Sequence, residues 1–211
     1  MKNRIKNRGA SGYSIVELII AMTIMLIILG LASSLFSRSL ATRQRESSRT
    51  DALTSAQAAL NVISRELANS GYGLAGNGLV LGADSDDEKL HFLSNIGNGN
   101  ETFTDPSENV TYYFDPATQS ILRHDAHGAG PNTPQSSTIV NRISDLGFEY
   151  FDYQGNNPPT GPNLTPTVNT SRIRVTVTVS LENVQGQVNP QSVVLVSDVT
   201  LRNSDYMLRQ Y

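Results

Sequence analysis

Among the carboxylates of this sequence, Glu17 most clearly requires a partner or access to water, because it lies at the start of a long apolar run. Residues 18–36, LIIAMTIMLIILGLASSLF, follow it without a single charge. A helix over this run would be about 28 Å long, close to the roughly 30 Å hydrocarbon core of a bilayer. A carboxylate beside such a segment is costly unless it is paired or reaches the interface. The sequence therefore predicts a membrane-spanning helix whose carboxylate has a partner in some state of the protein.

A basic segment precedes the run. Residues 1–12 carry four basic residues and no acid, and they end at Gly12. The remainder holds 12 basic and 19 acidic residues, a formal charge of −7, which argues against nucleic-acid binding by the bulk of the chain. The run is long for a secretory signal, and no small-x-small cleavage site precedes a soluble segment. An uncleaved signal anchor is the alternative from hydropathy alone.

The junction between these two segments resembles the N-terminus of the type IV prepilins. Gly12 is followed by Tyr13-Ser14-Ile15-Val16-Glu17. The resemblance implies cleavage after Gly12 by prepilin peptidase, N-methylation of Tyr13, and a role for Glu17 in assembly and registration. It also implies the partners: the peptidase/N-methyltransferase, other major and minor pilins, the inner-membrane assembly platform and the membrane itself.

Physical chemistry adds a reason for Glu17. The residue lies one helical turn from the future Tyr13 amine, at the positive end of the helix dipole, which lowers its cost. In a packed filament, the cationic N-terminal amine of a neighbouring subunit is its natural partner, and methylation keeps that charge. The alternative is that Glu17 simply reaches the cytoplasmic interface, which would leave Gly12 unexplained. Four Lys or Arg residues precede the run and four follow soon after it (Arg38, Arg43, Arg45 and Arg49), so the balance near the run does not set the orientation.

After the apolar run the pattern becomes that of an amphipathic helix. Apolar residues recur in steps of three and four at Leu53, Ala56, Leu60, Ile63 and Leu67, and Gly71 is suited to a left-handed cap. One helix from about Tyr13 to Ser70 is therefore predicted, with its second half packed on a sheet.

Beyond the helix, the apolar period changes to two. Alternation is clearest over residues 172–181 and is also present around 110–114, 121–123, 148–151 and 193–201. One apolar face per strand is typical of an antiparallel sheet with one covered side. The predicted fold is α+β: the type IV pilin fold, in which a long N-terminal helix packs on an antiparallel sheet. Its expected parts are a leader (1–12), a transmembrane or filament-core helix (13–36), an amphipathic continuation (37–70) and a β-sheet domain with long loops (71–211).

The resemblance extends to a subtype. Residues 60–73, LNVISRELANSGYG, the Asp-rich turn before residues 90–93 and the closing Val199-Thr200-Leu201-Arg202-Asn203 look like the PilW-type minor pilins, with the J-type pseudopilins of type II secretion close. The apolar helix has no proline and the chain has no cysteine, both unlike the major pilins. A minor pilin that initiates or caps a pilus at its tip is implied. It would be held first in the inner membrane with a periplasmic C-terminal domain.

Three further motifs offer other chemistry. Gly71-Tyr72-Gly73-Leu74-Ala75-Gly76 fits a dinucleotide motif but follows a helix, so it is interpreted as a flexible exit from that helix. Asp84, Asp86 and Asp87 could supply calcium oxygens, although a solvated turn before a strand is favoured. His124-Asp125-Ala126-His127 lacks a third soft metal ligand.

No nucleophile motif is evident, so we expect neither an enzyme nor a cofactor. A signal-anchored periplasmic enzyme or binding domain is the distant alternative. Residues 124–137 and 154–170 are predicted to be long loops that could contact a surface, DNA or another subunit.

Overall fold

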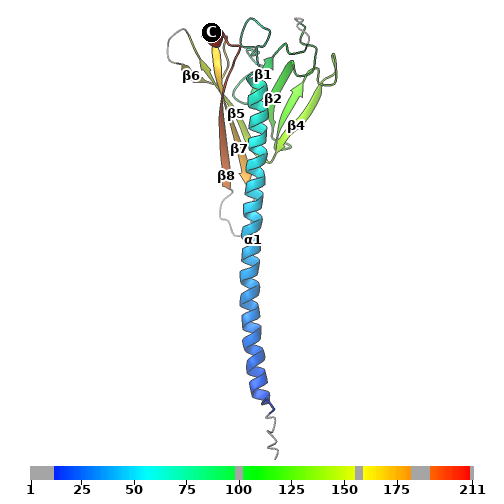
Figure 1. The fold of residues 1–211 in the computed structure, drawn as a ribbon, viewed down its shortest axis with the longest axis vertical. Coiled ribbons are helices and arrows are strands. Elements are labelled where there is room, and N and C mark those ends of the chain that lie inside the picture. Colours follow the sequence, from blue (N-terminus) through cyan, green and yellow to red (C-terminus); the bar gives the residue numbers. More distant parts are fainter. Residues whose placement is uncertain (1–11, 98–101, 155–158, 182–190, 210–211) are drawn as a thin grey trace, which may run out of the picture. The chain divides into compact units, whose positions relative to one another are not determined.

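The computed structural model describes residues 12–97, 102–154, 159–181 and 191–209 (Figure 1). The chain divides into two compact units, Met1–Glu46 and Ser47–Tyr211. Helix α1, Ile15–Leu67, begins in the first unit and ends in the second. Each unit is described by itself below.

In the first unit, α1 is apolar on every side from Leu18 to Phe36. All residues from 12 to 40 are exposed, among them the large side chains of the predicted apolar run. No proline interrupts α1, and the hydroxyl of Thr23, within the apolar run, donates to the carbonyl oxygens of Ile19 and Ile20 at 3.0 and 2.8 Å. An 18-residue window of α1 reaches a mean hydropathy of 2.7 with none of it buried, so this helix is long and apolar enough to cross a membrane. A helix that is apolar all round needs lipid or other helices around it.

In the second unit, the last turns of α1 carry the predicted apolar stripe into the core. Ala56, Leu60, Ile63 and Leu67 are buried, as predicted, whereas Leu53 is only half-buried. Ala59 is also buried, a position that the predicted stripe omits. The helix ends at Leu67, three residues before the predicted end, and Gly71 adopts a left-handed conformation with φ of 76°.

The first sheet is antiparallel and follows the chain in order, β1-β2-β3-β4. Its strands are β1 (Lys89–Leu93), β2 (Asn109–Asp115), β3 (Ser120–Asp125) and β4 (Gln135–Asn141). Buried residues from this sheet, such as Leu90, Phe92 and Tyr112, face the helix and join the common core.

The second sheet is also antiparallel, in the order β6-β5-β7-β8. Its strands are β5 (Ile143–Asp152), β6 (Thr160–Asn163), β7 (Thr170–Leu181) and β8 (Gln191–Thr200), and the short helix α2 (Asp205–Leu208) follows. The apolar face predicted for β7 is present, because Ile173, Val175, Val177 and Val179 are all buried.

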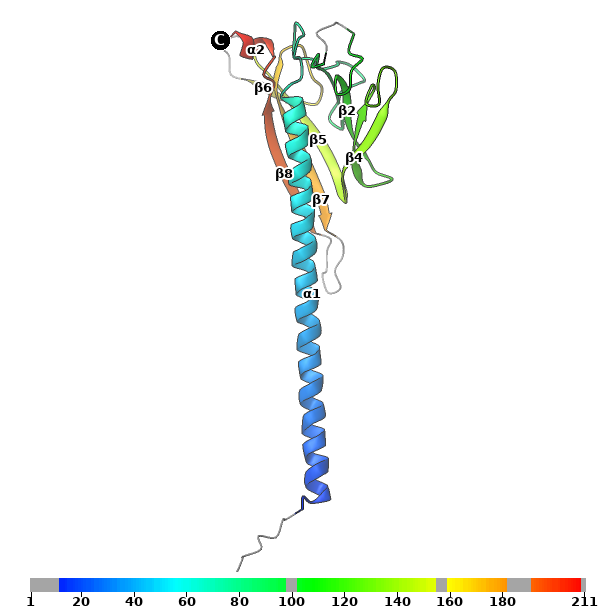
Figure 2. The same ribbon diagram turned by 45° about the vertical axis from the view of Figure 1, so that its right-hand side comes forward.

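The α+β class with a long N-terminal helix and antiparallel strands is confirmed, but the strands form two sheets instead of the one expected. A single residue, Arg142, separates β4 from β5, and its φ of 62° turns the chain out of the first sheet. Ile143 starts β5 by donating its backbone N–H to the carbonyl of Gln119 at 2.9 Å. The final turns of α1 lie against both sheets (Figures 1 and 2).

Both predicted loops contain strand. Residues 124 and 125 end β3, and β4 begins at 135, which leaves a turn of residues 126–134. Strand β6 lies inside the segment 154–170, of which residues 155–158 lie outside the described residues. The end of this segment is organised by the buried Asp152, whose carboxylate accepts hydrogen bonds from Thr170, Thr167 and Asn163 at 2.7, 2.9 and 3.2 Å.

At the helix exit, the backbones of Gly71, Gly78 and Leu93 approach one another closely. Gly71 donates its N–H to the carbonyl of Leu93 at 2.9 Å, and Leu93 donates to Gly78 at 2.7 Å. A Cβ at Gly78 would overlap Gly71 N and Leu93 O, so these backbones approach closely only without a side chain. Asn77 links the exit to the loop before β7 by donating from Nδ2 to the carbonyls of Thr167 and Thr170, both at 2.9 Å.

Candidate functional site

The segment from Gly12 to Glu17 is an exposed helix start. Gly12, Tyr13 and Ser14 are not helical, and α1 begins at Ile15. The carbonyl of Ser14 accepts the hydrogen bond from the Leu18 N–H at 3.1 Å, so Ser14 occupies the N-cap position. Tyr13 is 83% exposed, and no heavy atom lies within 4 Å of the position that a Cβ on Gly12 would take. Gly12 and Tyr13 are thus both exposed.

Glu17 lies in the first turn of α1, three residues after the N-cap. Ser14-Ile15-Val16-Glu17 has the spacing of a capping box, in which the carboxylate helps to satisfy free N–H groups at the helix start. The helix dipole favours a negative charge at this end. In the described part of a single chain Glu17 is exposed and makes no ion pair.

The sequence prediction did not consider this capping spacing. Glu17 is four positions after Tyr13, which is about 6 Å along a helix axis. A new amine at Tyr13 would therefore appear within one turn of the carboxylate. Residues 1–11 of the predicted leader lie outside the described residues.

A second polar site, within the folded unit, joins the end of α1 to the first sheet. The carboxylate of Glu66 accepts hydrogen bonds from the Tyr112 hydroxyl at 2.8 Å and from Arg123 Nε at 2.9 Å. Burial raises the pKa of Tyr112, and the charge and hydrogen bond of Glu66 raise it further. The phenol therefore keeps its proton and acts as a donor at any ordinary pH.

The same arginine reaches deeper into the sheet. Arg123 donates to Asp125 at 3.1 Å and to the Ser107 hydroxyl at 2.9 Å, and Asp125 is 1% exposed. Asp125 also accepts the backbone N–H groups of Ser107 and His127 at 2.7 and 3.0 Å. Because each buried charge has partners, this network fixes the helix on the sheet without leaving an unpaired charge. No periodic pattern signals it, since Glu66 and Arg123 lie 57 residues apart.

The network accounts for the motif His124-Asp125-Ala126-His127. Asp125 belongs to the network, His124 Nδ1 is 2.9 Å from the Ser136 hydroxyl, and His127 Nδ1 accepts the Asn132 N–H at 2.9 Å. The three side chains have separate structural partners and do not converge on one point.

The acidic turn 84–88 is held by its own backbone. Asp86 accepts the N–H groups of Glu88 and Lys89 at 2.9 and 2.8 Å, while Asp84 lies 3.6 Å from the Lys89 amine. The turn also contacts the second sheet, because the Asp86 carbonyl accepts the Tyr150 hydroxyl at 2.7 Å and the Asp87 carbonyl accepts the Phe148 N–H at 2.8 Å. Among the described residues, Asp84, Asp86 and Asp87 form no group that could hold a metal ion.

Comparison with known proteins places the N-terminal segment in a class. Residues 7–33 match the family model of the prokaryotic N-terminal methylation motif. The match includes Gly12, Tyr13 and Glu17 and most of the apolar run, and it supports a type IV pilin-like protein. It does not extend into the β-sheet unit.

A solved structure is similar over more of the chain. The crystal structure of the GspK-GspI-GspJ complex from the enterotoxigenic Escherichia coli type 2 secretion system contains a chain that matches with 14% identity and a TM-score of 0.39. The match covers 69% of this protein and 96% of that chain. A similarity of this degree does not establish a shared function. No curated protein matches the chain.

Proposed function

We propose that this protein is a structural subunit of a type IV pilus-like filament, with no catalytic activity of its own. The observation that carries the proposal is the joint presence of an accessible Gly12–Tyr13 bond, a carboxylate at position 17 and the motif match over residues 7–33. Prepilin peptidase would cut this bond and methylate the new amine of Tyr13. The apolar part of α1 would hold the subunit in the inner membrane before assembly.

The exposed apolar surface of α1 explains why assembly would be favourable. From Ile15 to Phe36 the large side chains are each more than half exposed in the single chain. Lipid covers this surface before extraction, and the helices of neighbouring subunits would cover it in the filament. Transfer between these two apolar environments leaves Glu17 as the group whose energy changes most.

Glu17 is proposed to register the subunit. In the filament core its carboxylate would meet the cationic N-terminal amine of a neighbour at low dielectric. Breaking such a buried pair by removing one partner costs on the order of 3–5 kcal/mol, because the other charge stays buried alone.

Within this class we propose a minor subunit of the PilW type that initiates or caps the pilus at its tip, with the folded unit in the periplasm. Partners would be other pilins and the inner-membrane assembly platform. The support for this subtype comes from the sequence alone, from the resemblance of residues 60–73 and from the absence of cysteine. A J-type pseudopilin of a type II secretion system is the alternative; genes for a secretin, a secretion ATPase and other pseudopilins beside the locus would favour it.

The test replaces the carboxylate. Glu17→Gln and Glu17→Ala should both be inserted and cleaved but incorporated into filaments at a small fraction of the wild-type level, measured by immunoblotting of sheared filaments. Glu88→Gln, which removes an exposed carboxylate in the folded unit, is the matched control and should be incorporated normally.

Incorporation of both Glu17 variants at the wild-type level would contradict the registration role. If Glu17→Gln were incorporated and Glu17→Ala were not, hydrogen bonding at the helix start would be the role of this side chain instead of charge pairing.

A further inference from the structure

The end of the apolar run is marked by two arginines that make no ion pair within the described chain. Arg38 follows Phe36 by two residues, and Arg43 lies one and a half turns further along α1. Both are exposed, and neither contacts a carboxylate in the part of the chain that the structure describes. No acidic residue occurs between Glu17 and Glu46. The two guanidinium groups are therefore available to an anion from outside the chain.

The spacing along the helix places them at a defined depth. From Glu17 to Arg38 there are 21 residues, or about 32 Å of helix, and the hydrocarbon core of a bilayer is about 30 Å thick. With Glu17 at one boundary of the core, Arg38 falls at the other boundary. Arg43 would then lie about 8 Å further out, within the headgroup layer.

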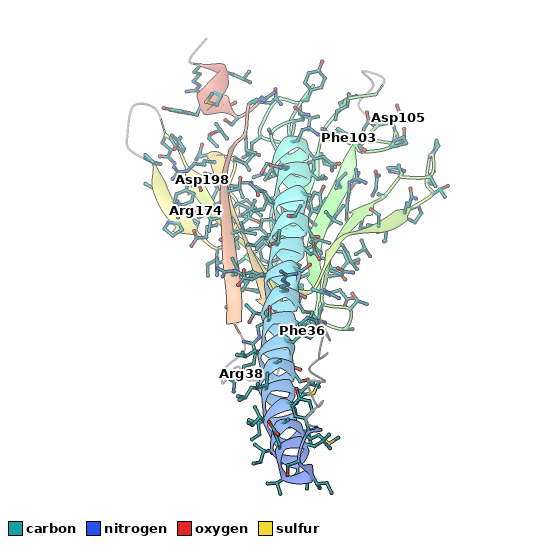
Figure 3. All side chains as sticks on the ribbon, turned by 60° about the horizontal axis from the view of Figure 1, so that its bottom comes forward. Phe36, Arg38, Phe103, Asp105, Arg174 and Asp198 are labelled. Carbon is teal, nitrogen blue, oxygen red and sulfur yellow. The ribbon has the colours of Figure 1, made fainter. Side chains whose placement is uncertain are left out.

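The positions of Arg38 and Arg43 around the helix axis indicate what kind of partner surrounds these two side chains. Arg38 and Arg43 are five residues apart, so their side chains leave the helix about 140° from each other. Figure 3 shows Arg38 and Phe36 projecting from opposite sides of α1. A single protein partner would contact one face of the helix, whereas a headgroup layer surrounds it on all sides. Charges on two sides at the edge of an apolar run match the second case.

We propose that Arg38 and Arg43 bind the phosphates of anionic phospholipids in the outer leaflet of the inner membrane, and so fix the depth of the subunit before it is extracted. The proposal depends on the membrane-inserted state that the proposed function includes. Guanidinium groups pair with phosphate oxygens through two parallel hydrogen bonds, which makes phosphate headgroups a suitable ligand.

The experiment uses the full-length chain in vesicles of phosphatidylcholine with spin-labelled phosphatidylglycerol or spin-labelled phosphatidylcholine. Electron paramagnetic resonance then gives the preference of the protein-bound lipid for the anionic headgroup. Arg38→Gln/Arg43→Gln should lower this preference about threefold or more, since each cation near a membrane surface contributes on the order of 1 kcal/mol. The basic leader is the same in both proteins, so it cancels from the comparison.

Arg65→Gln/Arg142→Gln is the matched control, because both residues are exposed in the folded unit and the same charge is lost. Its lipid preference should equal that of the wild type. The lipid preference of the wild type is also measured in inorganic phosphate and in chloride at the same ionic strength, to test whether free phosphate competes with the lipid headgroups. The preference should be the same in the two salts.

Three results would overturn the proposal. An unchanged preference in Arg38→Gln/Arg43→Gln would show that these arginines do not select anionic lipid. A selective loss of preference in phosphate would identify free phosphate as the ligand. Extraction of the wild-type chain from vesicles by alkaline carbonate would contradict the inserted state itself, and with it the proposed function. Insertion without lipid preference would leave the proposed function standing.

Discussion

Glu66 and Arg123 form a salt bridge of 2.9 Å between the last turn of α1 and strand β3, with side chains that are 25% and 13% exposed. Arg123 continues to the buried Asp125, so the helix end is tied through two charges to the interior of the first sheet. If the apolar end of α1 assembles as proposed, this attachment would transmit force on the helix to the folded unit.

We expect residues 38–211 to fold as a soluble monomer without the apolar run. The buried positions of α1, from Ala56 to Leu67, and both sheets share one core within the unit Ser47–Tyr211. Circular dichroism should show mixed helix and strand with a cooperative thermal transition, and light scattering should give the monomer mass. An unfolded spectrum would contradict the assignment of the core to this unit.

Loss of the Tyr112 hydroxyl should destabilise this fragment. Tyr112→Phe removes the hydrogen bond to Glu66 and should lower the free energy of unfolding by about 1 kcal/mol, measured in urea. Tyr113→Phe, at the next position of β2, is the control and should change stability by less than about 0.5 kcal/mol. Equal effects of the two variants would mean that the Glu66 bond adds nothing to stability.

Two glycines of the helix exit should respond differently to alanine. Gly78 has φ of 74° and approaches the backbone of Gly71 and Leu93, whereas a Cβ at Gly76 would meet nothing within 4 Å. Gly78→Ala should cost about 2 kcal/mol or more in unfolding free energy, because the backbones must separate. Gly76→Ala should stay within about 0.5 kcal/mol of the wild type. A tolerated Gly78→Ala would contradict the close packing of this exit.

An ion pair on the outer face of the second sheet should make a pH-dependent contribution to the free energy of unfolding. Arg174 donates from Nε to Asp198 at 2.8 Å, and this hydrogen bond holds the pKa of the Asp198 carboxyl below its ordinary value of 3.8 (the pair is labelled in Figure 3). On acidification the unfolded chain therefore takes up this proton first. The stabilisation is complete above about pH 5 and is lost as the pH falls through the lowered pKa.

Asp198→Asn should accordingly destabilise the fragment by about 0.2–1 kcal/mol at neutral pH, a small effect because the pair is exposed. The difference from the wild type should shrink as the pH is taken below 3.8, measured by urea unfolding along a pH series. A difference that grew on acidification would show that the carboxylate is not stabilised by Arg174.

The parts of this fold that sequence could predict are those with a strong period. The apolar stripe of α1 and the alternation of β7 could be predicted because each element buries four residues of its apolar repeat. Strand β4 was missed because Gln135-Ser136-Ser137-Thr138 is polar and exposed, and β6 because it contains Gly161 and Pro162, which are rare in strands. The division into two sheets depends on the backbone of Arg142, and no sequence pattern predicts that an arginine adopts a left-handed conformation.

The candidate site divides in the same way. Gly12, Tyr13 and Glu17 were assigned roles from a short contiguous motif, which the family model over residues 7–33 also covers, and these roles stay predictions. The Glu66–Arg123–Asp125 network could not be predicted, since it requires knowing which strand meets the end of α1. The acidic turn and the histidine pair suggested metal chemistry only while their hydrogen-bond partners, which are distant in sequence or on the backbone, were unknown.

The most direct test of the account is the mass of the mature N-terminal peptide, taken from filaments or membranes of cells that contain the peptidase. Digestion and tandem mass spectrometry should identify a peptide that begins at Tyr13 and carries one added methyl group on its amine. Gly12→Val should block cleavage and leave the full leader in place. A chain that retains Met1 or begins elsewhere than Tyr13 in assembled filaments would contradict the assignment of this protein as a processed pilin-like subunit.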